Sequence, residues 1–223
     1  MMSVPTPSAA IERLRITEIF HSLQGEARSV GWPTVFVRLT GCPLRCVWCD
    51  TEYSFHGGEW REIDDIVEEV KKYRARHVCV TGGEPLAQKR CLELLRRLCD
   101  AGFDVSLETS GALDVSQVDP RVSRVVDVKA PGSGESERNL WSNLDLLGAH
   151  DQIKFVLADR ADYDWAIDVV DRRSLATRCE VLFSPVAGKL APGDLADWII
   201  ADGRQVRMQV QLHKLLWGNT PGK

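Results

Sequence analysis

The chain has 223 residues, of which 44% are hydrophobic, and its formal net charge at pH 7 is -4. This length and apolar content are enough for one domain with a full hydrophobic core, and they exclude an intrinsically disordered chain. The small acidic excess argues against a general nucleic-acid binder, because phosphate contacts need an excess of Lys and Arg. No apolar run reaches the roughly 18 residues of a membrane-spanning helix, so we expect neither a nucleic acid nor a membrane as a direct partner.

The N-terminal segment and the cysteine count indicate where the protein works. Residues 1–10 contain Pro and Ser but neither a basic region nor a long apolar stretch, so we expect a loose leader and not a signal peptide. Residues 11–223 are then expected to form a single core domain. The seven cysteines are an odd number, and a core-rich chain needs no disulfide framework. Unpaired thiols are typical of the reducing cytoplasm, where we place the protein.

Strand-like runs alternate with amphipathic stretches along most of the chain. This alternation predicts an α/β fold, with βα units around a mostly parallel sheet. In chain order, strands are predicted over residues 15–20, 34–39, 77–80, 104–108, 125–129, 153–157, 180–183 and 205–210. Helices are predicted over residues 63–73, 86–101, 163–172 and 195–201. The second helix is expected to end at Gly102, because glycine is the usual residue after a helix C-terminus.

The residues that directly follow the predicted strands are the first candidates for a functional site. Parallel α/β folds bind their ligands at the carboxyl ends of the strands. Eight residues occupy such positions, namely Cys42, Gly82, Gly83, Thr109, Gly111, Lys129, Ser184 and Pro185. We therefore expect these eight residues to converge on one rim of the sheet.

Three cysteines lie within eight residues, as Cys42-Pro-Leu-Arg-Cys46-Val-Trp-Cys49. A [4Fe-4S] cluster that only carries electrons is normally held by four thiolates, whereas three thiolates leave one iron open to a small molecule. The spacing therefore indicates chemistry at that iron. The alternative is a structural zinc site, which a fourth Cys or His normally closes. The other cysteines, Cys79, Cys91, Cys99 and Cys179, are scattered in apolar surroundings and are expected to be small core residues.

A second motif, Thr81-Gly82-Gly83-Glu84-Pro85, lies between a predicted strand and a predicted helix. Its two glycines lack Cβ atoms, so backbone amides and carbonyls can approach a ligand closely. Proline is well tolerated at a helix start. Glu84 adds a negative charge beside this backbone, which suits the ammonium group of a ligand.

Together, the cysteine run and the Gly-Gly-Glu-Pro motif resemble the radical S-adenosylmethionine superfamily. There the open iron binds the amino and carboxylate groups of S-adenosylmethionine, and reduction yields a 5'-deoxyadenosyl radical. Further segments resemble the 7-carboxy-7-deazaguanine synthase family within it, namely residues 20–26, 36–46, 49–51, 108–111 and 211–217. The resemblance implies a modified partial (β/α) barrel. It also implies a ring contraction of 6-carboxy-5,6,7,8-tetrahydropterin to 7-carboxy-7-deazaguanine with loss of ammonia, on the route to queuosine and related deazapurines.

The resemblance also assigns substrate and magnesium residues. Those assigned to the pterin are Leu23, Gln24, Gly25, Glu26, Arg38, Thr109 and His213. Arg38 would pair with the substrate carboxylate, to which its planar fork can donate two parallel hydrogen bonds. Thr51 would supply a hydroxyl to Mg²⁺, which takes oxygen ligands and often shares its site with a substrate. His213 lies among Leu212, Leu215 and Leu216, which look like packing residues, so a structural role for this histidine also stays open.

The remaining assignments concern the cofactors. Cys42, Cys46 and Cys49 would hold the [4Fe-4S] cluster. The residues assigned to S-adenosylmethionine are Gly82, Gly83, Glu84, Gly111, Lys129, Ser133, Phe183, Ser184, Pro185 and Val186. No side chain is assigned as a catalyst, because the reactive radical comes from the cofactor.

The resemblance further implies a flavodoxin-like electron donor and, since a partial barrel leaves exposed edges, a homodimer. The chain departs from the family at Ala27, where a glycine is expected, and in the tail from Gly218 to Lys223, which leaves the role of Pro221 open. Two other functions share the cysteines. A glycyl-radical activase would need no carboxylate and Mg²⁺ site, and an iron–sulfur sensing module would not cleave S-adenosylmethionine.

Overall fold

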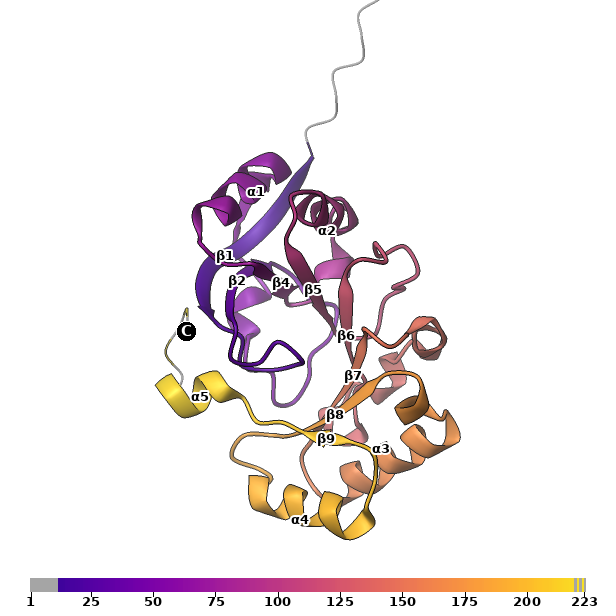
Figure 1. Ribbon diagram of the computed structural model, residues 1–223. Helices are drawn as coiled ribbons and strands as arrows, with labels where there is room; N and C mark the ends of the chain where they lie inside the picture. The colour runs from indigo at the N-terminus through magenta and orange to yellow at the C-terminus, as the bar shows by residue number, and fades with distance from the viewer. Residues whose placement is uncertain (1–11, 219, 221, 223) are drawn as a thin grey trace, which may run out of the picture.

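The computed structural model describes residues 12–218, 220 and 222. The expected leader over residues 1–10 and Pro221 lie outside the described residues. Within them, nine strands form one curved sheet in the order β3-β1-β2-β4-β5-β6-β7-β8-β9 (Figure 1). The strands are β1 (Arg13–Leu23), β2 (Pro33–Leu39), β3 (Glu59–Glu62), β4 (His77–Gly82), β5 (Asp104–Thr109), β6 (Ser123–Asp127), β7 (Gln152–Leu157), β8 (Glu180–Pro185) and β9 (Arg207–Met208).

All neighbouring strands from β2 to β9 are parallel, whereas β1 pairs antiparallel with β2 and with β3. The α-helices are α1 (Ile63–Lys72), α2 (Cys91–Asp100), α3 (Arg160–Arg172), α4 (Pro192–Asp202) and α5 (Leu212–Trp217). Figure 1 shows α1 to α4 along the outer side of the sheet and α5 near the N-terminal strands. The predicted α/β fold with a mostly parallel sheet is confirmed.

Two hydrophobic cores hold the helices against the outer face of the sheet. One includes Val80 and Leu107 and lies under α1 and α2, and the other includes Phe155 and lies under α3 and α4. Because successive side chains of a strand point to opposite faces, Cys79 and Glu108 point inward, where the Cys79 thiol lies 3.8 Å from the Glu108 carboxylate. The helices therefore leave the inner face of the sheet for polar groups.

The scattered cysteines belong to the packed interior. Cys79, Cys91 and Cys179 are buried, and Cys99 packs against the core under α2. All four are unpaired. Burial raises the pKa of Cys179 to about 11, so its thiol stays protonated at neutral pH. Their prediction as small core residues is confirmed.

The structure differs from the sequence-based elements where segments are short. The helix predicted from residue 86 begins at Cys91, because Pro85–Ala87 forms a separate 3₁₀ turn, in which the Leu86 N–H donates to the Glu84 side chain. The strand predicted over residues 205–210 has only the two residues Arg207–Met208. Strand β3 and helix α5 were not predicted, since four and six residues are too few for a clear periodic pattern.

Ala27 has a backbone φ of 62°, in the left-handed region that glycine adopts most easily. Its methyl group is 3% exposed and packs with Val125 and Leu182 on the inner face of the sheet. Where a glycine is expected, the chain thus has an alanine in a left-handed conformation whose methyl group is buried in apolar contacts.

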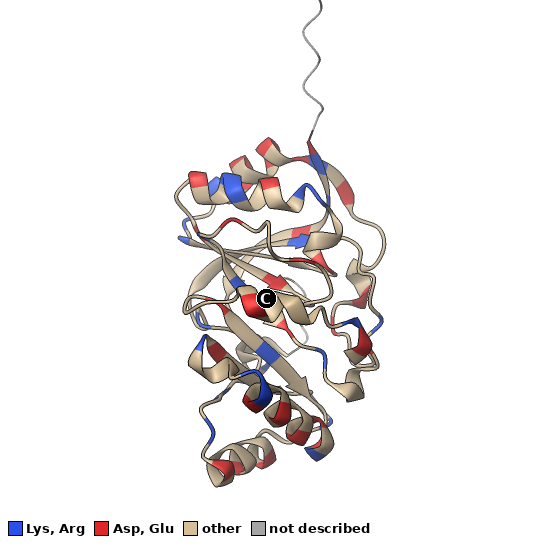
Figure 2. Ribbon diagram, turned by 90° about the vertical axis from the view of Figure 1, so that its right-hand side faces the viewer, with Lys and Arg blue, Asp and Glu red and all other residues tan. Residues whose placement is uncertain are grey.

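The outer surface carries both signs of charge. Figure 2 shows Lys and Arg interspersed with Asp and Glu along the helices. On α2, for example, Arg96 and Arg97 both pair with Glu93, at 2.5 and 2.6 Å. In the described part of the chain, no helix combines the length and apolar character needed to cross a membrane.

A matched pair of substitutions tests the packing of the helices on the sheet. Ile66 on α1 is fully buried, whereas Ile200 on α4 is 76% exposed. We expect Ile66→Ala to lower the free energy of unfolding by about 2–5 kcal/mol, because it removes apolar contacts and leaves a cavity. Ile200→Ala should change it by less than about 0.5 kcal/mol. Urea unfolding followed by circular dichroism measures both, and equal losses would contradict this packing.

Candidate functional site

A cavity of about 560 Å³ lies on the inner face of the sheet. Of the eight residues expected on one rim, seven line this cavity, and Gly111 does not. The Gly111 carbonyl instead accepts hydrogen bonds from the Leu140 N–H and the Asn143 side chain, both at 3.1 Å. Gly111, with a φ of 74°, therefore forms a turn behind the wall, and the expected rim position is wrong for this residue.

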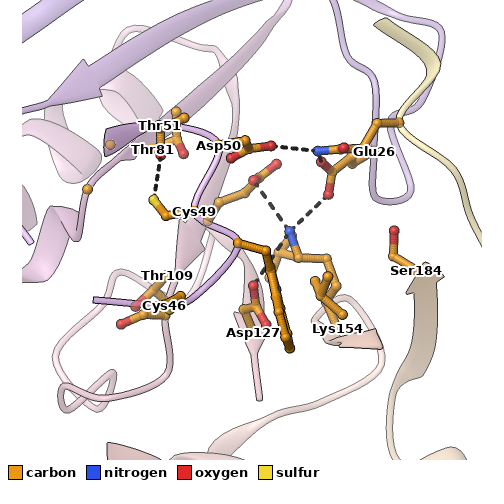
Figure 3. Close-up of a pocket in the computed structure, with 18 of the residues that line it drawn as sticks. Glu26, Cys46, Cys49, Asp50, Thr51, Thr81, Thr109, Asp127, Lys154 and Ser184 are labelled. Carbon is orange, nitrogen blue, oxygen red and sulfur yellow. Dashed lines mark hydrogen bonds and ion pairs between the residues drawn. The ribbon is translucent and has the colours of Figure 1, made fainter. Parts of the chain in front are cut away.

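The loop after β2 brings all three motif cysteines to the cavity wall, and Figure 3 shows two of them, Cys46 and Cys49. Cys42, Cys46 and Cys49 are half-buried and unpaired. Leu44, which is 1% exposed, anchors the loop in the interior. The Val47 N–H donates to the Ser133 carbonyl at 3.0 Å. These contacts fix the loop while the three thiols stay accessible from the cavity.

The thiols of this loop fit an iron–sulfur cluster. Burial raises the pKa of Cys42 and of Cys46, so both are protonated until a metal displaces the protons. Three thiols on one wall match three corners of a [4Fe-4S] cluster, in which each thiolate binds a different iron.

Gly82 and Gly83 seat the turn after β4 directly on the cysteine loop. A Cβ atom on Gly82 would overlap the Leu39 carbonyl oxygen, and one on Gly83 would overlap the Gly41 carbonyl oxygen. The Glu84 N–H donates to that same Gly41 oxygen at 2.8 Å. Only glycine allows this backbone approach, so the motif is needed to build the wall as well as to admit a ligand.

Glu84 does not line the cavity. Its carboxylate is fully buried and accepts hydrogen bonds from the Thr109 hydroxyl at 2.9 Å, the Ser110 N–H at 2.6 Å and the Leu86 N–H at 2.9 Å. The expectation that this side chain takes a ligand's ammonium group is wrong, because neighbouring donors already occupy its oxygens. Glu84 instead positions Thr109, which does line the cavity.

Arg38 on β2 points into the cavity with its side chain held on three sides. Its Nε donates to Glu18 Oε1 at 2.7 Å, and the Tyr53 hydroxyl donates to the same oxygen at 2.8 Å. Its guanidinium carbon lies 5.8 Å from the ring centres of both Phe20 and Tyr53. The contact through Nε leaves the two terminal nitrogens available for a bidentate pair with a carboxylate.

The segment after β1 forms the wall opposite the cysteines. Leu23, Gln24 and Glu26 line the cavity. Gly25 lies against His213, because a Cβ atom on this glycine would overlap the histidine Nδ1. The Gly25 carbonyl also accepts a hydrogen bond from the Leu212 N–H at 3.0 Å. The expected pterin residues therefore contact the start of α5.

Helix α5 covers this side of the cavity. His213 lines it, and burial lowers the pKa of this histidine, which favours the neutral imidazole. Leu215 and Leu216 are 72% and 50% exposed, so their prediction as packing residues is wrong. A six-residue helix can bury only one side, and here that side carries His213.

Thr51 and Asp50 follow the last motif cysteine and line the cavity. The Thr51 hydroxyl lies 3.8 Å from the Cys49 thiol. Asp50 accepts hydrogen bonds from Gln211 at 3.0 Å and Lys214 at 3.1 Å. Burial acts to raise the pKa of Asp50, but the hydrogen bonds from Gln211 and Lys214 and the charge of Lys214 leave it below its ordinary value. A hydroxyl beside an ionised carboxylate fits the oxygen ligands and bound waters that Mg²⁺ prefers.

Of the residues expected in the loops that contact the cofactor, some line the cavity and one lies in the hydrophobic core. Lys129, Ser133, Ser184, Pro185 and Val186 line the cavity. Phe183 does not, because its side chain is fully buried in the core under α3 and α4, so a side-chain contact with the cofactor is ruled out for this residue. Alternation along β8 explains the difference, since Phe183 and Ser184 point to opposite faces.

Three charged cavity residues on the strands were not predicted, namely Glu108, Asp127 and Lys154. Figure 3 shows Lys154 pointing between Glu26 and Asp127. Its ammonium nitrogen lies 2.9 Å from Glu26 and 3.9 Å from both Glu108 and Asp127. The sequence signal was a lysine inside the otherwise apolar residues 153–157 of this strand, where a charge needs a buried partner.

Comparison with known proteins agrees with this geometry. A family model described as the Radical SAM superfamily matches residues 36–172. A protein of Chlorobaculum tepidum named 7-carboxy-7-deazaguanine synthase is 45% identical over 92% of this chain and 94% of its own length. A protein of Thermoplasma acidophilum with the same name is 39% identical, over 93% of this chain and 99% of its own length.

The fold has solved relatives as well. The crystal structure of QueE from Escherichia coli superposes with a TM-score of 0.74 at 26% identity, over 90% of this chain and 95% of that one. The crystal structure of Streptococcus suis SuiB, at 14% identity and a TM-score of 0.57, shares the fold over 80% of this chain. These likenesses confirm the partial barrel. The chain belongs to the radical S-adenosylmethionine superfamily and, within it, to the 7-carboxy-7-deazaguanine synthase family.

Proposed function

We propose that this protein converts 6-carboxy-5,6,7,8-tetrahydropterin to 7-carboxy-7-deazaguanine and ammonia, a step toward queuosine and related deazapurines. One molecule of the pterin yields one molecule of each product, so the atoms balance. The observation that carries the proposal is a single cavity in which three thiols face the same space as Arg38, whose terminal nitrogens are available. A carboxylated substrate can thereby be held beside the cofactor.

The cysteine loop would hold a [4Fe-4S] cluster with S-adenosylmethionine on its open iron, and Gly82, Gly83 and Ser184 would contact that cofactor. When bound, this pair supplies the radical that abstracts hydrogen from carbon 6 of the pterin. The side chains then position carbon 6 and exclude competing hydrogen donors, without serving as nucleophiles. Arg38 pairs with the carboxylate, and Gln24 and Glu26 contact the ring.

Magnesium would bind at the Thr51 hydroxyl and be shared with the substrate. Asp50 supports this site, because its charge lies next to Thr51 in the chain. Helix α5 helps to exclude water from this side, since Gln211 donates to Glu26 at 2.9 Å and to Asp50 at 3.0 Å. One glutamine thereby connects the pterin wall with the magnesium residues.

The proposal includes two protein partners. A flavodoxin-like donor would deliver the electron for the cluster from the cysteine-loop side of the cavity. A second copy of the chain would cover exposed sheet edges, because β3 and β9 are the two outer strands of the described sheet and Trp60 on β3 is 63% exposed. Unpaired edges are commonly covered in this way.

The activity is tested directly with anaerobically reconstituted protein. Incubation with the carboxy-tetrahydropterin, S-adenosylmethionine, reductant and Mg²⁺ should release 7-carboxy-7-deazaguanine and equal ammonia, measured by liquid chromatography with mass spectrometry. Treatment with a chelator that removes Mg²⁺ should slow turnover, and added Mg²⁺ should restore it. Cleavage of S-adenosylmethionine without deazaguanine would overturn the proposed substrate and leave the superfamily membership intact.

The cluster assignment predicts opposite results for two cysteine substitutions. Cys46→Ala should abolish the about four irons per chain expected for a [4Fe-4S] cluster, because two thiolates cannot hold it. Cys99→Ala should keep them, since Cys99 packs on α2, away from the cavity. Iron and sulfide analysis with electron paramagnetic resonance measures both proteins. Full cluster content in Cys46→Ala would contradict the assignment.

The role of Arg38 predicts a loss of substrate affinity without loss of the cofactor. Arg38→Lys should raise the KM for the pterin by about 10- to 100-fold, because an ammonium group cannot make two parallel bonds to a carboxylate. Glu18→Gln should raise it less, since the guanidinium stays but loses its ionised support. The cluster spectrum with S-adenosylmethionine serves as the control and should stay unchanged in both. An unchanged KM in Arg38→Lys would exclude the carboxylate contact.

A further inference from the structure

The inner face of the barrel carries a group of charges that no assignment above uses fully. Three acidic side chains, Glu26, Glu108 and Asp127, lie around Lys154. Three of these four residues lie on the parallel strands β5, β6 and β7, where Asp127 and Lys154 are paired in register. The sheet itself therefore fixes their positions.

Two of the three acidic side chains already accept short hydrogen bonds from protein donors. Glu26 accepts one hydrogen bond from Gln211 and one from Lys154, both at 2.9 Å and on different oxygens. Asp127 accepts from Lys129 at 2.9 Å through one oxygen, and its other oxygen is buried without a protein partner and out of reach of the cavity space. Neither carboxylate offers two accessible oxygens to a ligand.

Glu108 differs from both. Its side chain is 21% exposed. Its Oε1 accepts only long hydrogen bonds, from Gln24 at 3.4 Å and from the Cys79 thiol at 3.8 Å, and its Oε2 lies 3.9 Å from Lys154. Charge-assisted hydrogen bonds are normally about 2.7–2.9 Å long, and an ionised carboxylate can accept about four. Of Glu26, Asp127 and Glu108, Glu108 is therefore the acid with the weakest existing contacts, and both of its oxygens can still accept hydrogen bonds from a ligand.

The position of Glu108 fits one end of the proposed substrate. Arg38 pairs with Thr81 across β2 and β4, and Val80 pairs with Leu107 across β4 and β5, so Arg38 and Glu108 stand at the same level of the sheet. Two strand spacings separate them, or about 10 Å. A two-ring heterocycle with a carboxylate at one end can bridge such a span. Its far end then meets Glu108.

The chemistry of that far end matches the free acceptor. In a pterin, the 2-amino group and the adjacent ring N–H are two parallel donors, which a carboxylate can accept side by side. We propose that Glu108 binds this amino-pyrimidine edge and makes the site select 2-amino pteridines over their 2-oxo analogues. The inference rests on the proposed function for the identity of the substrate, and it names the residue that determines specificity at its ring.

Lys154 supports this role through charge. Burial raises the pKa of Glu108, and the Lys154 ammonium group opposes this rise. Lys154 itself stays protonated, because Glu26, Glu108 and Asp127 raise its pKa although burial acts to lower it. The ammonium group thus favours the ionised form of Glu108, which accepts hydrogen bonds. Because Glu108 is largely shielded from water, the two donors of the ligand would replace the hydrogen bonds that water otherwise provides.

The test measures binding of two stable probes to the reconstituted full-length protein with Mg²⁺. The probes are 6-carboxypterin, with a 2-amino group, and 6-carboxylumazine, with a 2-oxo group in its place. The wild type should bind the pterin at least about 10-fold more tightly. Glu108→Gln should lower the preference by about 10- to 100-fold, because the loss of charged hydrogen bonds has that magnitude. The new amide can also donate to the 2-oxo group.

A matched control variant and a separate activity assay distinguish failure of the Glu108 inference from failure of the proposed reaction. Glu180→Gln, an acid of β8 that pairs on the surface with Arg28 and Arg207, should keep the wild-type preference. Equal weakening of both probes in Glu108→Gln would indicate a structural role only and overturn the inference, as would a wild type without any preference. Deazaguanine formation by the wild type is assayed separately. If it fails while the preference depends on Glu108, the inference stands and the proposed reaction falls.

Discussion

The buried carboxylate of Glu84 ties three strand ends into one wall, and the cavity depends on it. The Glu84 backbone N–H donates a hydrogen bond to the Gly41 carbonyl, in the loop after β2. The Glu84 carboxylate accepts hydrogen bonds from Thr109 and Ser110, at the end of β5. A buried carboxylate without such partners would cost several kcal/mol, so the burial of Glu84 depends on these hydrogen bonds. They hold the cysteine loop, the Gly-Gly turn and a threonine that lines the cavity in fixed positions relative to one another.

The fold was largely readable from the sequence, because long runs of alternating or helical periodicity mark elements that bury one face. Residues 63–73 predicted α1 to within one residue. Short elements were missed for the same reason: α5 has six residues and exposes Leu215 and Leu216. Hydrophobicity suggested that these leucines pack, but their burial depends on which elements lie nearby, and that information is tertiary.

The sequence predicted those parts of the candidate site whose residues lie close together in the chain as a motif. The spacing of Cys42, Cys46 and Cys49 and the paired glycines identified one wall. Residues that act through distant partners were not found. Lys154 lies 128 positions from its partner Glu26 in the chain. Glu84 points toward Thr109 and away from the cavity, and the sequence does not show that these two residues are neighbours. Sequence patterns give the type of a charged group, whereas folding decides whether it faces the ligand or a neighbour.

Gln211 and Lys214, at the start of α5, both hold Asp50, which stands in the chain between Cys49 and Thr51, the proposed magnesium residue. Any displacement of α5 would release Asp50 from both bonds at once. Because Gln211 also donates to Glu26 at 2.9 Å, the start of this helix sets the positions of two carboxylates on the cavity wall. Moving α5 would therefore change the charges around the proposed magnesium residue and around the proposed pterin wall together.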